Sequence, residues 1–295
     1  MIRTITRPPD AQMAPLLRAY AQARAARRRQ ILLGLLIAAS AFVLAWQMAE
    51  VEPGIFWRNL GNFTSYFGRL AHLDTGALVW TDPAEWYWGL KRWLLLLGQT
   101  LMMAYLGTAT GFLGGFILCF LCSRNLVRNA PLRWLMRRFL EFCRTVPDIV
   151  FALIFVVAFG LGPLPGVLAI AIHTTGALGK LFAEVVESID MRPVEGIAAA
   201  GGNWLERIRF AVLPQVLSNF TSYALLRFEV NVRGATVLGF VGAGGIGEEL
   251  ITAIRKFFYS DVSAILLLVV VCVVAIDLTS EHIRHRLLAN ESRRP

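Results

Sequence analysis

The chain has 295 residues, of which 56% are hydrophobic and only 17% are charged, and its formal net charge is +9 at pH 7. Soluble domains carry about a quarter of charged residues, so this composition excludes an ordinary soluble protein and predicts an integral membrane protein. The positive charge does not indicate a nucleic-acid-binding protein, because the arginines flank apolar runs and form no nucleic-acid recognition motif.

The first 30 residues form a basic segment with a single acid, Asp10. We expect a cytoplasmic tail here, with a surface helix on anionic lipid as one possible form, because basic segments beside a span stay on the cytoplasmic side. The apolar run from Ile31 to Met48 then predicts a first membrane helix, just long enough to cross. A secretory signal is disfavoured, since its basic region would be shorter and no cleavage site follows.

Residues 50–91 form the longest segment expected outside the membrane, on the far side. Its acids slightly outnumber its basic residues, and its many tryptophan, tyrosine and phenylalanine side chains suit an interfacial aromatic belt. A surface that stacks nucleic-acid bases is poorly supported in an acidic segment. Residues 31–92 are therefore interpreted as the first membrane helix followed by a periplasmic, aromatic-rich loop.

Five further apolar runs predict membrane helices at about residues 93–122, 147–161, 166–182, 220–241 and 262–278. Small residues in the first of these, Gly107, Gly111, Gly114 and Gly115, favour the close approach of another helix. The segment 124–144 contains six arginines and one glutamate, so we expect it in the cytoplasm, as an amphipathic helix on the membrane surface. Arginines after residue 281 place the C-terminal tail, 281–295, on the same side. The prediction is an all-α membrane protein with six transmembrane helices and both termini in the cytoplasm.

The loop 193–214 is not apolar enough for a membrane, yet it carries strong helix signals. Pro193 suits the first turn of a helix, and Gly201-Gly202 ends that helix, because glycine adopts the left-handed cap. Asn203 and Glu206 are spaced as a capping box for a second helix. Pro214 predicts the end of that helix or a kink in it. The sequence therefore predicts two short helices that meet at a glycine corner.

This loop resembles the EAA loop of the membrane subunits of bacterial ABC importers. Glu195, Gly201 six residues later, and then Leu213-Pro214 keep the spacing of that motif, whereas Gly196, Ile197 and Ala211 depart from its usual residues. The resemblance implies a cytoplasmic coupling helix that fits into a groove of a partner ATPase. The residues that it assigns to ATPase coupling are Glu195, Ala199, Gly201, Asn203, Trp204, Leu213 and Pro214.

Charged and polar side chains interrupt the fifth span at Arg227, Glu229, Asn231 and Arg233. Three charges at a helix centre cost roughly 8 kcal/mol on insertion scales, and the apolar residues of the span return about 5 kcal/mol. The span must therefore turn these groups to the protein interior or to a wet cavity. Spacing of four residues allows Glu229 to pair with Arg233 on one face, and Arg227 with Asn231 on the other.

Two interpretations of this polar set remain open. It is either a structural ion-pair network between helices or an anion-conducting lining, because its arginines outnumber its glutamate. In the second case His173 and Thr174 of the fourth span join the substrate pathway, together with Thr175.

Two stretches imitate nucleotide sites. Gly242, Gly244 and Gly247 satisfy the dinucleotide fingerprint, but this stretch lies at the end of a membrane helix rather than in a βαβ unit. We interpret these glycines, with Gly245, as a backbone break near a gate. Residues 174–181 lack the first glycine and the final hydroxyl residue of a phosphate-binding loop. We therefore expect no cofactor in this chain, and ATP and magnesium are expected on a separate ATPase subunit.

Catalytic and metal-binding patterns are weak. Cys119 and Cys122 have the spacing of a metal or redox motif but no second pair of ligands. The four histidines are scattered, and His282 and His285 suit a solvated face. We expect neither a metal site nor an enzyme.

Several stretches resemble the phosphonate permeases among these importers, notably 144–155, 179–184, 202–205 and, most particularly, 227–247. The likeness covers roughly residues 90–285, so residues 93–280 would form a permease core of the type I importer fold. It implies alternating-access import of phosphonates or related phosphorus oxyanions across the bacterial inner membrane. It also implies a second copy of the chain, two copies of an ATPase and a periplasmic phosphonate-binding protein as partners. The alternatives are an ion-coupled secondary transporter of a small anion, which would use Glu229 and show inverted repeats, and a membrane-embedded enzyme, which the missing catalytic set disfavours.

Overall fold

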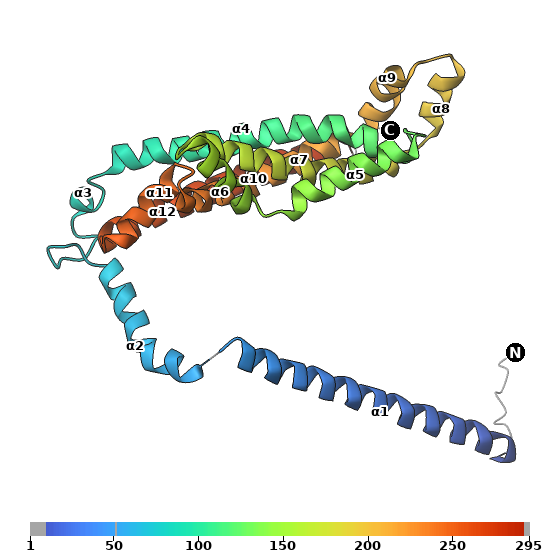
Figure 1. Ribbon diagram of the computed structural model, residues 1–295, viewed down its shortest axis with the longest axis horizontal. Coiled ribbons are helices and arrows are strands. Elements are labelled where there is room, and N and C mark those ends of the chain that lie inside the picture. The colour runs from blue at the N-terminus through green and yellow to red at the C-terminus, as the bar shows by residue number, and fades with distance from the viewer. Residues whose placement is uncertain (1–9, 51, 292–295) are drawn as a thin grey trace, which may run out of the picture. The chain divides into compact units, whose positions relative to one another are not determined.

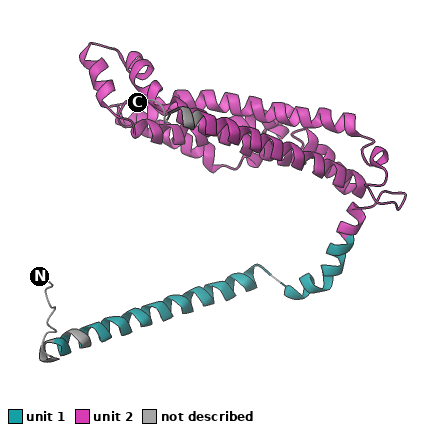
Figure 2. Ribbon diagram, turned by 180° about the vertical axis from the view of Figure 1, so that it is seen from behind, with its two compact units in different colours: residues 1–65 teal, residues 66–295 magenta. Residues whose placement is uncertain are grey.

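The computed structural model describes residues 10–50 and 52–291 of the chain, and its regular elements there are helices (Figure 1). An isolated β-bridge between His72 and Leu78 is the exception within this described part. The chain divides into two compact units, residues 1–65 and 66–295 (Figure 2). Residues 1–9 of the predicted N-terminal tail and 292–295 of the predicted C-terminal tail lie outside the described residues.

The first unit contains helix α1 (Asp10–Met48) and most of α2 (Pro53–Leu70). Residues 10–30 of the basic segment and the first apolar run form one continuous helix, so Ile31 begins the apolar run but not a new helix. The alanines and arginines around that point are good helix formers, so nothing in the local sequence ends the helix there. The segment after residue 50 was predicted to be a loop, but α2 has apolar residues at 56, 60, 63 and 67, which is the spacing of one helix face.

The second unit is a bundle of helices that contains the remaining elements. Their bounds are α3 (Pro83–Trp86), α4 (Leu90–Cys122), α5 (Ala130–Thr145), α6 (Asp148–Phe159), α7 (Pro163–Glu187), α8 (Arg192–Ala199), α9 (Trp204–Arg207), the π-helical turn η1 (Ile208–Val212), α10 (Leu213–Leu238), the 3-10 turn η2 (Gly239–Val241), α11 (Ile246–Arg255) and α12 (Tyr259–Glu291).

Four of the six predicted spans are single long helices, within α1, α4, α7 and α12. The third and fifth qualify as spans only as bent pairs, α5 with α6 at 85° and the run Trp204–Val241 with α11 at 48°. By itself α6 has 12 residues, about 18 Å of helix against a hydrocarbon core of about 30 Å. Pro147 explains the break, because it forces Val146 out of the helical region, to ψ 124°.

Helices α4 and α7 form the centre of the bundle, and small residues bring them together. A side-chain carbon at Gly111 would lie 2.6 Å from Thr174, and one at Gly115 would lie 2.8 Å from the backbone of Gly179. These distances are shorter than van der Waals contact, so no larger residue fits without moving a helix. The close approach that was expected from the glycine spacing of the second span is confirmed, with α7 as its partner.

Candidate functional site

The predicted coupling loop is a helical hairpin at one end of the bundle, made of α8 and α9 (Figure 1). Gly201 forms its corner with φ +86°, the left-handed conformation that side chains disfavour. The capping box is present: the Glu206 amide donates to Asn203 Oδ1 at 3.0 Å, and the Asn203 amide donates to Glu206 Oε2 at 2.7 Å. Both helices and the corner between them were predicted from sequence.

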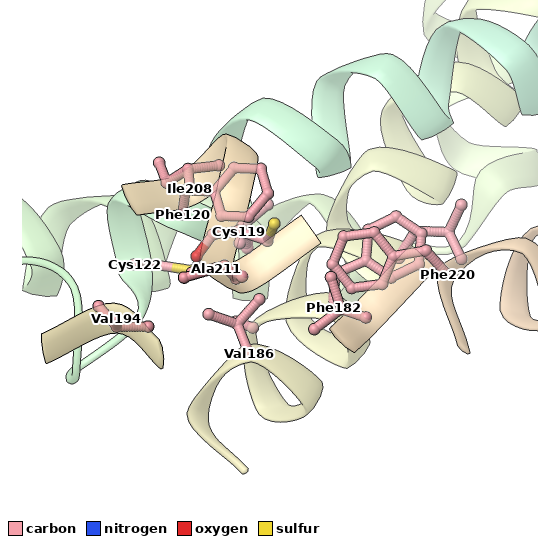
Figure 3. Close-up of a cluster of buried hydrophobic side chains, with 14 residues drawn as sticks. Cys119, Phe120, Cys122, Phe182, Val186, Val194, Ile208, Ala211 and Phe220 are labelled. Carbon is pink, nitrogen blue, oxygen red and sulfur yellow. Dashed lines mark hydrogen bonds between the residues drawn. The ribbon is translucent and has the colours of Figure 1, made fainter. Parts of the chain in front are cut away.

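The base of this hairpin is packed into the bundle. Val194 of α8 and Ile208 and Ala211 of η1 are buried in a cluster with residues of α4 and α7 (Figure 3). In the same cluster the rings of Phe182 and Phe220 stack with centroids 3.9 Å apart. A displacement of the hairpin is therefore transmitted to the packed core, since close-packed side chains do not deform freely.

The tip of the hairpin faces away from the bundle. Glu195, Ala199, Gly201, Asn203 and Trp204 are all exposed, which leaves them available to a partner. Leu205, next to Trp204 in α9, is an exposed apolar side chain with 67% of its surface accessible. Exposed apolar side chains that lie together are typical of an interaction surface.

Pro214 does not end a helix, contrary to one form of the prediction. The chain passes from α9 through the π-helical turn η1 into α10, and Pro214 stands in the first turn of α10, where its missing N–H is harmless. Leu213 is half-buried and Pro214 is exposed. The helical run from Trp204 to Val241 thus connects the hairpin to the middle of the bundle.

A side-chain clamp joins the segment before α8 to the first turn of α10, at the base of the hairpin. The Gln215 amide accepts from the Asp190 N–H at 3.1 Å and donates to the Asp190 carbonyl at 3.2 Å. The Asp190 carboxylate in turn accepts from the Arg192 guanidinium at 2.8 Å. These hydrogen bonds from Arg192 lower the pKa of the Asp190 carboxyl below its ordinary value. Sequence reasoning missed Gln215, which shows no pattern of its own.

The polar side chains of α10 divide between two faces, as their spacing requires. On the first face Asn231, which is 3% exposed, donates to Thr108 of α4 at 2.8 Å and to Thr174 of α7 at 2.9 Å. Arg227 Nη2 donates to His173 Nδ1 at 2.9 Å. Since arginine can only donate, His173 carries its proton on Nε2 and donates it to the Arg144 carbonyl at 3.2 Å.

The second face of α10 pairs with α12. Arg233 Nη1 contacts both carboxylate oxygens of Asp277, at 3.0 and 3.1 Å, and Glu229 lies 3.8 Å from Arg284. The expected pairing of Glu229 with Arg233, and of Arg227 with Asn231, was therefore wrong. Spacing of four residues permits such pairs within α10. However, α7 and α12 pack against these two faces, and their side chains contact the polar groups of α10 instead.

Two further residues meet the first face and were not chosen from sequence. Arg144, in the last turn of α5, contacts it through its backbone carbonyl, which accepts from His173. Asp148 begins α6 and interacts electrostatically with both His173 and Arg227. The bend at Pro147 brings them there. Their signal was present in the stretch 144–155, which was noted for its resemblance but not for its charges.

The glycine-rich loop after α10 is a backbone break, as predicted. Gly242, Gly244 and Gly245 have positive φ angles. A side-chain carbon at Gly245 would overlap Thr100 of α4, and one at Gly247 would overlap the Thr236 carbonyl. The loop is also hydrogen-bonded to its surroundings, since the Ile246 amide donates to Thr100 Oγ1 at 2.9 Å. A gating role for these glycines stays a prediction.

Within the part of the chain that the structure describes, no group of three or more histidine, cysteine or acidic side chains could hold a metal ion. The thiols of Cys119 and Cys122 are buried and donate to helix carbonyls. His285 lies 3.6 Å from Glu281 on the exposed end of α12.

Comparison with known proteins decides the family. Residues 107–288 match the family described as the binding-protein-dependent transport system inner membrane component. This chain belongs to that family. The family is a transport component of the inner membrane and not an enzyme, which sets aside the secondary-transporter and enzyme alternatives.

Individual relatives agree with this assignment. The phosphite transport system permease protein PtxC of Stutzerimonas stutzeri is 40% identical over 246 residues, covering 78% of this chain and 90% of that protein. A protein of Escherichia coli K12 that is described as a cryptic phosphonate transport permease, PhnE2, is 51% identical over 121 residues, covering 41% of this chain and 99% of its own length. The fold is that of the type I ABC importer membrane chains. The inward-facing MetNI methionine ABC transporter aligns with a TM-score of 0.58 at 19% identity, over 66% of this chain and 95% of that chain.

Proposed function

We propose that this family member moves a phosphorus oxyanion, such as a phosphonate or phosphite, across the bacterial inner membrane by alternating access. The observation that carries the proposal is the helical run Trp204–Val241. It joins an exposed hairpin, suited to a partner, with a buried polar cluster, suited to an anion. Movement at one end of a packed helix necessarily changes the surroundings of the other.

Arg227 is the residue best placed to attract the anion. Its guanidinium fork matches tetrahedral oxyanions bidentately and stays charged when partly buried. In the structure Arg227 contacts His173 at 2.9 Å and Thr174 at 3.5 Å, and neither partner brings a negative charge. Arg233, in contrast, is neutralised by Asp277 at 3.0 Å. Asp148 tempers the positive charge, so that a bound anion can be released. The pathway therefore lies on the face of α10 that carries Arg227 and Asn231, and Glu229 and Arg233 belong to the pairing with α12.

The partners in this proposal are two ATPase subunits, a second copy of the chain and a periplasmic binding protein that delivers the substrate. The hairpin formed by α8 and α9 seats in the ATPase, and ATP and magnesium bind there rather than in this chain. Both termini and the hairpin lie in the cytoplasm, as the arginine-rich segments at 124–144 and 281–295 favour.

Uptake of radiolabelled phosphite and phosphonate by cells that express the transport system tests the pathway. Arg227→Gln is expected to reduce uptake at least tenfold with unchanged membrane abundance, since one charge-assisted contact contributes about 1.5–3 kcal/mol. Arg92→Gln, which removes an exposed arginine at the other end of the bundle, serves as the control. Equal uptake by both variants and the unaltered chain would reject the assignment of Arg227.

A further inference from the structure

A basic groove lies where α4 gives way to α5. It is an open surface groove of about 480 Å³, lined by Arg124, Ala130, Arg133, Trp134, Arg137 and Arg138. Four arginines in one groove repel one another unless negative charge accompanies them, so their existing partners decide what the groove can still bind.

Two of these arginines already have carboxylate partners. Arg137 is paired with Glu187 of α7 and donates to the Cys122 carbonyl at 2.9 Å. Arg138 lies 2.6 Å from Glu141. The remaining two have no carboxylate partner among the described residues: Arg133 donates to the Val127 carbonyl at 2.8 Å. Arg124 is exposed, and its backbone rather than its side chain contacts Glu187.

An exposed apolar stripe begins at the rim of the groove and follows α5. Trp134 is 62% exposed, and Leu135, Phe139 and Phe142 follow it on one helix face, exposed by 54%, 47% and 59%. Their spacing of four and three residues is that of a single helix face. A charged groove that continues into an apolar stripe has the chemistry of a lipid, with an anionic head group and hydrocarbon chains.

We propose that this groove is a binding site for an anionic phospholipid. The phosphodiester accepts hydrogen bonds from Arg124 and Arg133, the Trp134 indole lies at the level of the head group, and an acyl chain follows Leu135, Phe139 and Phe142. Tryptophan prefers this interfacial level because its ring is apolar and its N–H is polar. The two positive charges that the protein leaves unpaired select against a zwitterionic lipid, which brings no net charge.

Native mass spectrometry of the full-length chain in detergent measures this binding. Dioleoyl phosphatidylglycerol is added in one arm, dioleoyl phosphatidylcholine in a second, and glycerol phosphate without acyl chains in a third. We expect phosphatidylglycerol to bind at least fivefold more tightly than phosphatidylcholine, and glycerol phosphate not to displace it. Equal affinity for the two lipids would overturn the proposal, as would full displacement by glycerol phosphate, which would indicate a site for soluble phosphate.

Charge-removing variants locate the site. Each arginine near a membrane surface contributes about fivefold to the affinity for an anionic lipid, so Arg124→Gln with Arg133→Gln should lose about 30-fold. The matched control, Arg209→Gln with Arg255→Gln, removes two exposed arginines outside the groove and should bind phosphatidylglycerol unchanged. Equal loss in both pairs would show diffuse attraction and overturn the site. If the double variant does not fold, Arg124→Gln alone tests the site, because the Arg124 side chain forms no hydrogen bond or ion pair among the described residues. This single variant should lose about fivefold in affinity for phosphatidylglycerol.

Discussion

The hairpin corner provides a pair of glycines for which the same substitution should have opposite effects. Gly201 has φ +86° and nothing within 4 Å of the position that a side-chain carbon would occupy. Gly201→Ala therefore adds no steric contact, and its whole cost is backbone strain of about 1–2 kcal/mol. Gly196 lies inside α8, also with open space around it, and Gly196→Ala should stabilise the helix by about 0.8–1.0 kcal/mol.

Hydrogen–deuterium exchange of the hairpin amides measures this difference. The Gly202 amide, which donates to the Ile197 carbonyl at 2.9 Å, and the Glu206 amide of the capping box report on the corner. We expect exchange about 5- to 30-fold faster in Gly201→Ala and about fourfold slower in Gly196→Ala, from the energies above. Both variants leave the buried base of the hairpin untouched, so membrane abundance should not change.

The outcome of this comparison is decisive for the corner geometry. If both alanine variants exchange at the rate of the unaltered chain, the left-handed corner does not hold the hairpin together. If both variants slow exchange, Gly201 is an ordinary helical residue, and the reasoning from its φ angle is refuted.

Three further predictions concern the interior and the clamp. Arg284→Gln leaves buried Glu229 without its cationic neighbour at 3.8 Å and should lower stability by about 1–3 kcal/mol. Adding Glu229→Gln in the same chain should restore much of the loss. Thermal unfolding in detergent measures both, and equal stability of the single and double variants would contradict the pairing. Gly247→Ala should abolish folding or force the backbone to move, because its side chain would overlap the Thr236 carbonyl; size-exclusion profiles of this variant and of Gly61→Ala, where space is open, separate the effect from a general loss of glycine. The pKa of Asp190 is lowered by Arg192. The stability that Asp190 contributes to the hairpin is therefore present above its ordinary pKa of 3.8 and is lost as the pH falls through the lower folded value. Exchange of the hairpin amides should accelerate below about pH 4, and persistence of this acceleration in Asp190→Asn would assign it to another group.

The hairpin was predictable in detail because its signals are local. Pro193, Gly201, Asn203 and Glu206 act on backbone groups within a few residues, so their spacing alone determines the geometry. The close contact of α4 with α7 was predictable in part. The glycines of α4 predicted the close approach of another helix, but only the folded chain shows that Thr174 and Gly179 of α7 are the residues in contact.

The partners of the charged residues could not be predicted in this way. Glu229 and Arg233 have the spacing of a pair within one helix. In the structure Arg233 pairs with Asp277 and Glu229 with Arg284, and each partner lies more than forty residues away in sequence. The break at Pro147 was predicted, because the sequence indicates the end of an amphipathic helix near residue 144 and the start of a span at residue 147. Hydropathy describes 147–161 as a complete span, but α6 has only 12 residues and qualifies as a span only together with α5. The position of Asp148 near His173 and Arg227 depends on the packing of α6 in the bundle and could not be predicted from spacing.

Transport in reconstituted vesicles tests the central claim most directly. The chain is combined with its proposed ATPase in proteoliposomes, substrate-loaded binding protein is supplied on the opposite face, and accumulation of radiolabelled phosphite or phosphonate is followed. The proposal predicts accumulation that requires ATP on the ATPase side. Gly201→Val should abolish this accumulation because the variant no longer binds the ATPase, and Arg227→Gln should reduce it at least tenfold. Accumulation without ATP, driven by a sodium or proton gradient alone, would contradict it.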